Sequence, residues 1–355
     1  MNEILDTVKD GFKISEFLES SKEFTMINFP EVDLEKIFTE VISGSFNFND
    51  IGLNVFSVLG DNILEIVKIL VTVLIVIIIN SIFKIVIESL ENNSSSKITE
   101  FIHYLVIVTI VLNLFINITD EFKEVLLNIN NFMNMFLPLI TGLMISTGNV
   151  LTSSVIQNIL FLSTIFISNF INMFLIPFFM ITVTLSIVSN LSNKVKIEKL
   201  SKFFKSSIVW CLGIILTIFI SLLSLETEIT SSVDSLTAKT TKAAVSNFIP
   251  VVGKIMGDSV ETVIGAFGIL KNSVGVIGLV VILSLTVFPI IKLLIMSILF
   301  NLTTVFSEMV ADEKIVKLIE GLSDNIKLLL GILISITIMF IIEIVIVIKI
   351  SYGLV

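Results

Sequence analysis

The feature that most constrains this chain is a series of apolar runs, each long enough to cross or enter a lipid bilayer. A helix needs about 20 residues to cross the ~30 Å hydrocarbon core. The runs occupy residues 63–87, 101–118, 132–145, 155–188, 207–225, 274–300 and 328–350. Hydrophobic residues make up 55% of the 355 residues, and charged residues only 15%. A water-soluble protein needs a more polar surface than this composition supplies. The sequence therefore predicts an all-α, polytopic integral membrane helical bundle.

Two of these runs leave the number of spans open between six and eight, with seven or eight favoured. Residues 132–145 contain Pro138, and this short run fits either a short span or a re-entrant piece packed against protein. Residues 155–188 contain Pro177 and would measure about 50 Å as a straight helix. They can form one tilted helix with an interfacial end, or two half-length helices that break near Pro177.

The distribution of lysine predicts how the spans are oriented. All 22 basic residues are lysines, and five of them lie between Asn193 and Lys205. Cytoplasmic loops are enriched in basic residues, so we expect this Lys-rich loop, 193–205, in the cytoplasm. Residues 226–273 then lie on the opposite side, residues 301–327 return to the cytoplasm, and the C-terminus faces out.

These features divide the chain into four regions. Residues 1–62 are acidic, with 12 acids against four lysines, and are predicted to be extracytoplasmic. They lack the apolar core of a signal peptide. Residues 63–225 form a first membrane bundle, residues 226–273 a Gly-rich amphipathic segment, and residues 274–355 the C-terminal membrane helices.

The sequence lacks the residue patterns of the common enzyme classes. His103 is the only histidine, which excludes an HExxH helix or a multi-histidine metal site. The pair Gly253-Lys254 lacks the other residues of a phosphate-binding P-loop. Residues 257–259 are not a nucleophile elbow, because no histidine lies nearby to act as base. We therefore expect no enzyme activity, no catalytic residues, no metal and no cofactor. Without arginine or a basic and aromatic stripe, nucleic-acid binding is not expected either.

Two charged residues lie deep inside apolar runs and are candidate intramembrane charges. Lys292 follows Pro289 in one run, and Glu343 lies near the end of the last. A charge at such a depth costs a few kcal/mol on insertion scales unless it snorkels, pairs or lines water. If the two helices are antiparallel and cross a ~30 Å core, the two residues differ in depth by ~7 Å. The favoured interpretation is a structural ion pair that fixes helix register, and the alternative is a water-lined pathway.

A glycine-rich stretch precedes the sixth apolar run. Six of the 16 glycines fall between residues 253 and 278. The Gly253-x-x-x-Gly257 spacing would allow close approach between helices, and ordinary helix packing fits it as well as a pore wall. The candidate packing or partner segment comprises Pro250, Gly253, Gly257, Asp258 and Gly265.

The run from Thr237 to Gly265, TAKTTKAAVSNFIPVVGKIMGDSVETVIG, resembles the signature region of the stage III sporulation protein AE family. The similarity extends from the first predicted span to the C-terminus. It includes SSVD at residues 231–234 and PIIK at residues 289–292. One departure concerns the amino end, where family members often have a signal peptide and this chain shows none.

The resemblance implies a role in endospore formation. The family belongs to an eight-protein set encoded together in spore-forming bacteria, several of whose members resemble secretion-system parts. With a forespore membrane protein, this set is implied to form a channel between mother cell and forespore, with the present component in the outer forespore membrane. The implied partners are the other proteins of the stage III sporulation A operon, the forespore membrane protein and the lipid bilayer.

Two functions from different classes follow. In the first, the chain is a structural channel or export-gate subunit, whose residues 226–273 dock ring-forming partners while the Lys-rich loop faces a cytoplasmic ATPase or scaffold. In the second, it is a self-sufficient secondary transporter, or permease, that moves a small solute past Lys292 and Glu343. We prefer the first, because the two halves of the chain show no convincing internal repeat.

Overall fold

The computed structural model describes residues 2–29, 31–47, 93–148, 150–191, 197, 199–221, 252–311 and 313–349, with parts of 64–86. This described part contains helices and no strand, which confirms the all-α prediction. Its helices are α1 (Asn2–Gly11), α2 (Ile14–Met26), α3 (Leu34–Ser43), α5 (Asn93–Ser146), α6 (Val150–Phe170), the π-helical turn η1 (Ile171–Leu175), α7 (Ile176–Leu191), the helix Lys199–Ser221, α9 (Val252–Val310) and α10 (Glu313–Lys349).

Five helical stretches of the described part are long and apolar enough to cross a membrane. They are Tyr104–Ser146, Ser153–Ser189, Lys199–Ser221, Val263–Met309 and Glu313–Lys349. The predicted runs 101–118 and 132–145 both belong to α5, which continues through Pro138 as one helix. In the predicted run 63–87, the described residues, which include 71–79, are helical, and the other positions of the run lie outside the described residues. The chain is thus a multi-pass helical membrane protein.

The run around Pro177 forms a continuous helix, which was one of the two alternatives. A proline ring clashes with the carbonyl group four residues earlier, here that of Met173. Met173 lies in the middle of η1, where the backbone takes a wider π turn. This wider turn accommodates the proline, and α6, η1 and α7 continue without a break.

The C-terminal half of the chain is a long helical hairpin. The 59 residues of α9 and the 37 residues of α10 are separated by Ala311 and one further residue. Most of residues 301–327, which are predicted to lie in the cytoplasm, belong to the adjoining ends of α9 and α10, and their side of the membrane stays a prediction. The predicted boundary between regions at residue 273 falls inside α9, which continues through it without a break. At 1.5 Å per residue, α9 is about 88 Å long and exceeds the thickness of one bilayer.

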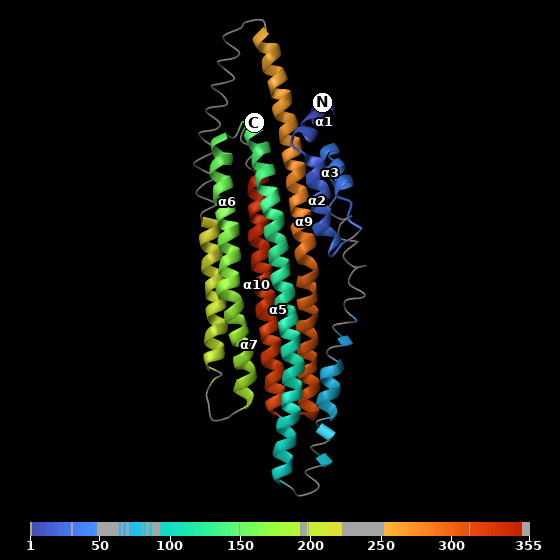
Figure 1. The fold of residues 1–355 in the computed structure, drawn as a ribbon, viewed down its shortest axis with the longest axis vertical. Helices are drawn as coiled ribbons and strands as arrows, with labels where there is room; N and C mark the ends of the chain where they lie inside the picture. The colour runs from blue at the N-terminus through green and yellow to red at the C-terminus, as the bar shows by residue number, and fades with distance from the viewer. Residues whose placement is uncertain are drawn as a thin grey trace.

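The long helices stand side by side along one axis (Figure 1). Helix α9 is antiparallel to α5, since Gly278 lies against Phe136 and Lys292 pairs with Glu121. Helix α10 is antiparallel to the continuous helix α6–η1–α7, since Asn325 donates a hydrogen bond to Ser186, whereas Glu343, later in α10, contacts the earlier Ser163. One end of the bundle therefore contains the α9–α10 turn and the start of the helix Lys199–Ser221. The other end contains the α5–α6 turn and the end of α10.

The three N-terminal helices cover α5 and α9 near the second end (Figure 1). Their apolar faces are buried: Phe17 and Phe24 of α2 pack on the ring of Phe132 in α5. Asn28 Nδ2 also donates a 3.0 Å hydrogen bond to the carbonyl group of Ser284 in α9. Helix α3 begins where the Asp33 carboxylate accepts bonds from two backbone N–H groups, and it ends at Gly44, whose φ is 73°.

Candidate functional site

An ion pair joins α5 and α9 at about the middle of the bundle. Lys292 Nζ lies 2.8 Å from both carboxylate oxygens of Glu121. The Lys292 side chain is 20% exposed and that of Glu121 is 51% exposed. Pro289, one turn before Lys292 in α9, lines a small cavity beside this pair. The geometry keeps the lysine charge partnered in a helix that is otherwise apolar at this height.

The predicted pair between Lys292 and Glu343 is wrong. Lys292 lies 18 residues before the end of α9, and Glu343 lies 30 residues after the start of α10. Their heights in the hairpin therefore differ by about 12 residues, or roughly 18 Å. The predicted depths of the two charges assumed spans at residues 274–300 and 328–350. In the structure, α9 continues to Val310 and α10 begins at Glu313. Moving the turn changes the register of the two helices and separates the charges.

Glu343 instead contacts two hydroxyl groups of α6. Its side chain is fully buried, Ser163 Oγ lies 2.6 Å from Oε1, and Thr164 Oγ1 lies 3.2 Å from Oε2. Ser163 Oγ is also 2.9 Å from the carbonyl oxygen of Leu160. Both hydroxyl groups donate to the carboxyl group of Glu343. These contacts give the buried Glu343 side chain polar partners in the core of the bundle.

Lys271 is a buried charge that the sequence interpretation missed. Its side chain is fully buried, and Nζ donates to the carbonyl oxygens of Val347 at 2.8 Å and Ile348 at 2.9 Å. The last four carbonyl groups of a helix lack partners within it, and a positive charge there also complements the helix dipole. Lys271 thus caps the C-terminus of α10. The sequence signal for Lys271 was a single lysine beside an apolar stretch. The predicted run began at Val274, so Lys271 was not counted as an intramembrane charge.

The candidate partner segment lies at the start of α9, away from these charges. Pro250 falls outside the described residues. Gly253, Gly257 and Asp258 occupy the first turns of α9, which extend past the rest of the bundle (Figure 1). Gly257 is about 53 Å from Lys292 along the helix axis, at 1.5 Å per residue. The structure therefore does not bring these residues and the two predicted charges into one site.

Close packing of glycine occurs further along α9. An added Cβ at Gly265 would meet nothing within 4 Å. At Gly278 it would lie 2.7 Å from the Phe136 ring, and at Gly275 it would collide with the side chain of Ile348. These two glycines let α9 approach α5 and α10 closely, whereas the packing role of Gly253 and Gly257 stays a prediction.

The two flanks of the bundle differ in polarity at the same height. Residues 2–43, which form α1–α3 on one flank, contain ten acids and four lysines. Residues 150–191, which form α6, η1 and α7 on the other, contain no charged residue. Two neighbouring residues of α5 show that the flanks lie at the same height. Phe132 contacts α2, and Asn130, half a turn earlier in α5, contacts Ser168 of α6. At this height the exposed side of α6 shows Leu162 and Phe166, which are 64% and 55% exposed.

Comparisons with known proteins agree on one family. The family model described as "Stage III sporulation protein AE" matches residues 32–351. A protein of Bacillus subtilis (strain 168), also described as "Stage III sporulation protein AE", is 26% identical over 297 residues, which cover 82% of this chain and 73% of the relative. No solved structure matches.

Proposed function

Because this chain belongs to the stage III sporulation protein AE family and acts in sporulation, we propose that it is a structural subunit of a membrane channel used in endospore formation. The proposal has the chain act without enzyme chemistry of its own. It places the chain in the outer forespore membrane, together with the other proteins of the stage III sporulation A operon and a forespore membrane partner, as the resemblance implies.

The observation that supports a channel subunit is the contrast between the two flanks. The helices α6 and α7 present an uncharged, apolar surface that suits lipid. At the same height, the acidic helices α1–α3 would place charges in lipid, which is costly. An acidic flank at this depth therefore faces water or another subunit. Several copies or partners arranged in a ring, with the acidic flank inward, would enclose such a space.

The mid-bundle charges of α5 fit the same arrangement. Asp120 pairs with Lys123 on the exposed side of α5, and Glu121 pairs with Lys292 of the neighbouring α9. Residues 206–225, which include most of the helix Lys199–Ser221 beside α10, contain no charge. Charged residues of α5 thus continue from the acidic flank toward the middle of the bundle.

Nitroxide labels on the full-length protein in proteoliposomes test this proposal. In a Cys211→Ser background, one label replaces Glu23 on α2 and another replaces Leu162 on α6, and electron paramagnetic resonance measures collisions with a water-soluble nickel chelate and with oxygen. We expect chelate access at position 23 and oxygen access at position 162. Lipid exposure at both positions would refute a water-facing flank. Water exposure at both would place this height outside the bilayer and would refute the proposal equally.

The transporter alternative is weakened by the separation of Lys292 from Glu343, since it required both to line one route. Purified chain alone in vesicles, loaded with small solutes, distinguishes the two functions. A channel subunit that needs partners gives no solute flux above empty vesicles. Saturable flux that Glu343→Gln abolishes would favour the transporter.

A further inference from the structure

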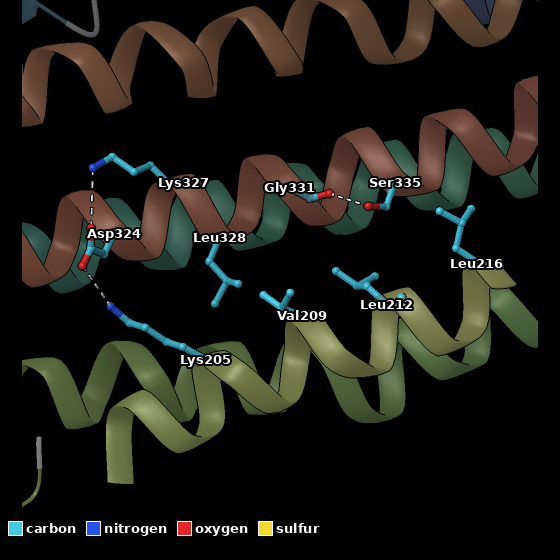
Figure 2. Close-up of a pocket in the computed structure, with 10 residues that line it drawn as sticks. Lys205, Val209, Leu212, Leu216, Asp324, Lys327, Leu328, Gly331 and Ser335 are labelled. Carbon is cyan, nitrogen blue, oxygen red and sulfur yellow. Dashed lines mark hydrogen bonds and ion pairs between the residues drawn. The ribbon is translucent and has the colours of Figure 1, made fainter. Parts of the chain in front are cut away.

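A groove lies between the helix Lys199–Ser221 and α10, on the apolar flank of the bundle (Figure 2). Its cavity volume is about 500 Å³. In Figure 2 the two helices run side by side, Leu328 lies opposite Val209 and Leu212 between them, and Asp324 lies between Lys205 and Lys327. The groove is apart from the acidic flank and from Glu343, so the channel proposal leaves it unexplained.

The two ends of the groove have different chemistry. At one end Lys205 and Lys327 approach Asp324 at 3.8 Å and 3.5 Å, respectively. One carboxylate cannot neutralise two lysines, so this end has a net positive charge that suits an anion. Toward the other end, the walls are Val209, Leu212, Leu216 and Leu328. Ser335 lies there too, but its hydroxyl group donates to the carbonyl oxygen of Gly331 at 2.8 Å and is already satisfied.

The length of the groove matches one leaflet of a bilayer. It extends from Lys205 to Leu216 on one helix and from Asp324 to Ser335 on the other. Either stretch covers 11 residue steps, or roughly 17 Å, whereas half of the hydrocarbon core is about 15 Å. Trp210, 72% exposed, lies on the same helix between the lysine end and the apolar end. Tryptophan is enriched where a membrane meets water, which agrees with the lysine end lying at the interface.

The volume favours a flexible chain over a protein helix. An α-helix with side chains is about 10 Å wide, so a 17 Å length of it occupies roughly 1,300 Å³. The cavity of about 500 Å³ therefore suits a narrower chain than a whole helix. Two glycines form part of its lining, Gly213 and Gly331, and an added Cβ at either would meet nothing within 4 Å. The groove is therefore open along its floor, and larger side chains at these glycines would fill it without a clash at Cβ.

We propose that this groove binds an anionic phospholipid of the leaflet at the Lys-rich end of the bundle. One acyl chain lies between the helix Lys199–Ser221 and α10, and the phosphate group lies at Lys205 and Lys327. Basic pockets between membrane helices suit anionic headgroups in this way. Asp324 keeps both lysines at the mouth of the groove, where they approach the phosphate from two helices.

The test measures lipid binding to the full-length protein in detergent by native mass spectrometry, with phosphatidylglycerol as the probe and phosphatidylcholine of the same chains as the uncharged comparison. We expect tighter binding of phosphatidylglycerol to the unmodified protein. Lys205→Met and Lys327→Met should each weaken it about fivefold, the effect of one basic residue near an anionic lipid. Lys317→Met, which removes an exposed lysine paired with Glu313 elsewhere on α10, is the matched control and should change nothing.

The acyl-chain half of the proposal has its own variant. Gly331→Leu fills the groove and should lower the binding of both lipids, whereas Gly265→Leu, at an open glycine of α9, should not. Circular dichroism and melting temperature establish that each variant is folded. Equal affinity for the two lipids, or full phosphatidylglycerol binding to folded Lys205→Met and Gly331→Leu proteins, would overturn the proposal. Competition by inorganic phosphate alone would also overturn it, because this result indicates that the groove binds a free anion. A change in the oligomeric state of Gly331→Leu with lipid binding intact would overturn it as well, because this result indicates that a second chain occupies the groove.

Discussion

At the scale of single residues, three ionisable groups in the apolar helices each have a partner of a different kind. Lys292 pairs with a carboxylate, Lys271 with two backbone carbonyl groups, and Glu343 with two hydroxyl groups. A charge at the centre of a membrane helix costs about 2.5–3.5 kcal/mol on insertion scales, so each partner reduces a real penalty. Only the first is an ion pair. It should therefore be the one whose members depend on each other's charge.

A double-mutant cycle tests that dependence. We expect Glu121→Gln to destabilise the protein, because it leaves Lys292 without a counter-charge, and the added change Lys292→Met to recover much of the loss. Combining Lys292→Met with Glu343→Gln should give additive losses, because the two sites are far apart. Thermal unfolding in detergent measures each variant. Additivity in the first cycle together with coupling in the second would contradict the observed pairing.

At the scale of elements, the apolar runs predicted which segments are helical but not where the helices end. A membrane-length run marks the lipid-compatible part of a helix, and polar residues beyond it do not stop the helix. Asp120 and Lys123 thus lie within α5, and the expected loop after Phe300 is three further turns of α9. The ion pair was missed because its register depends on those ends. The partner of Lys271 lies 76 residues away along the chain, so no local pattern could indicate it.

Close approach of α9 to α5 depends on Gly278, and a matched pair of alanine variants tests this. Gly278→Ala places a Cβ 2.7 Å from the ring of Phe136, which is fully buried and stacked on Phe132. Gly268→Ala, in the same helix, meets nothing within 4 Å. Both changes gain the same helix propensity, so we expect the Gly278 variant to be less stable than the Gly268 variant by roughly 1–3 kcal/mol. Chemical denaturation in detergent measures the difference, and equal stabilities would show that Phe136 can move aside.

At the scale of the whole molecule, the bundle has two distinct ends and two distinct flanks. The start of the helix Lys199–Ser221 and the α9–α10 turn lie at one end, since Lys205 is 3.8 Å from Asp324 of α10. This end contains Lys199, Lys202 and Lys205 on one helix and Lys314 and Lys317 on the other. The opposite end contains the acidic helices α1–α3 and the α5–α6 turn. The enrichment of basic residues in cytoplasmic segments predicts that the lysine end faces the cytoplasm.

Cysteine labelling from each side of the membrane tests this orientation. Ser201 is unsuitable as a reporter, because it is only 6% exposed and contacts Ser186. In a Cys211→Ser background we choose Leu200 and Met309 at the lysine end, 47% and 74% exposed, and Val150 at the other end, 52% exposed. A membrane-impermeant maleimide should label position 150 on intact protoplasts and positions 200 and 309 only in inverted vesicles. The reverse pattern would invert the orientation but keep the fold. Labelling of positions 200 and 309 from different sides would contradict the fold itself, because the contacts of Lys205 and Asn325 with neighbouring helices place both positions at one end.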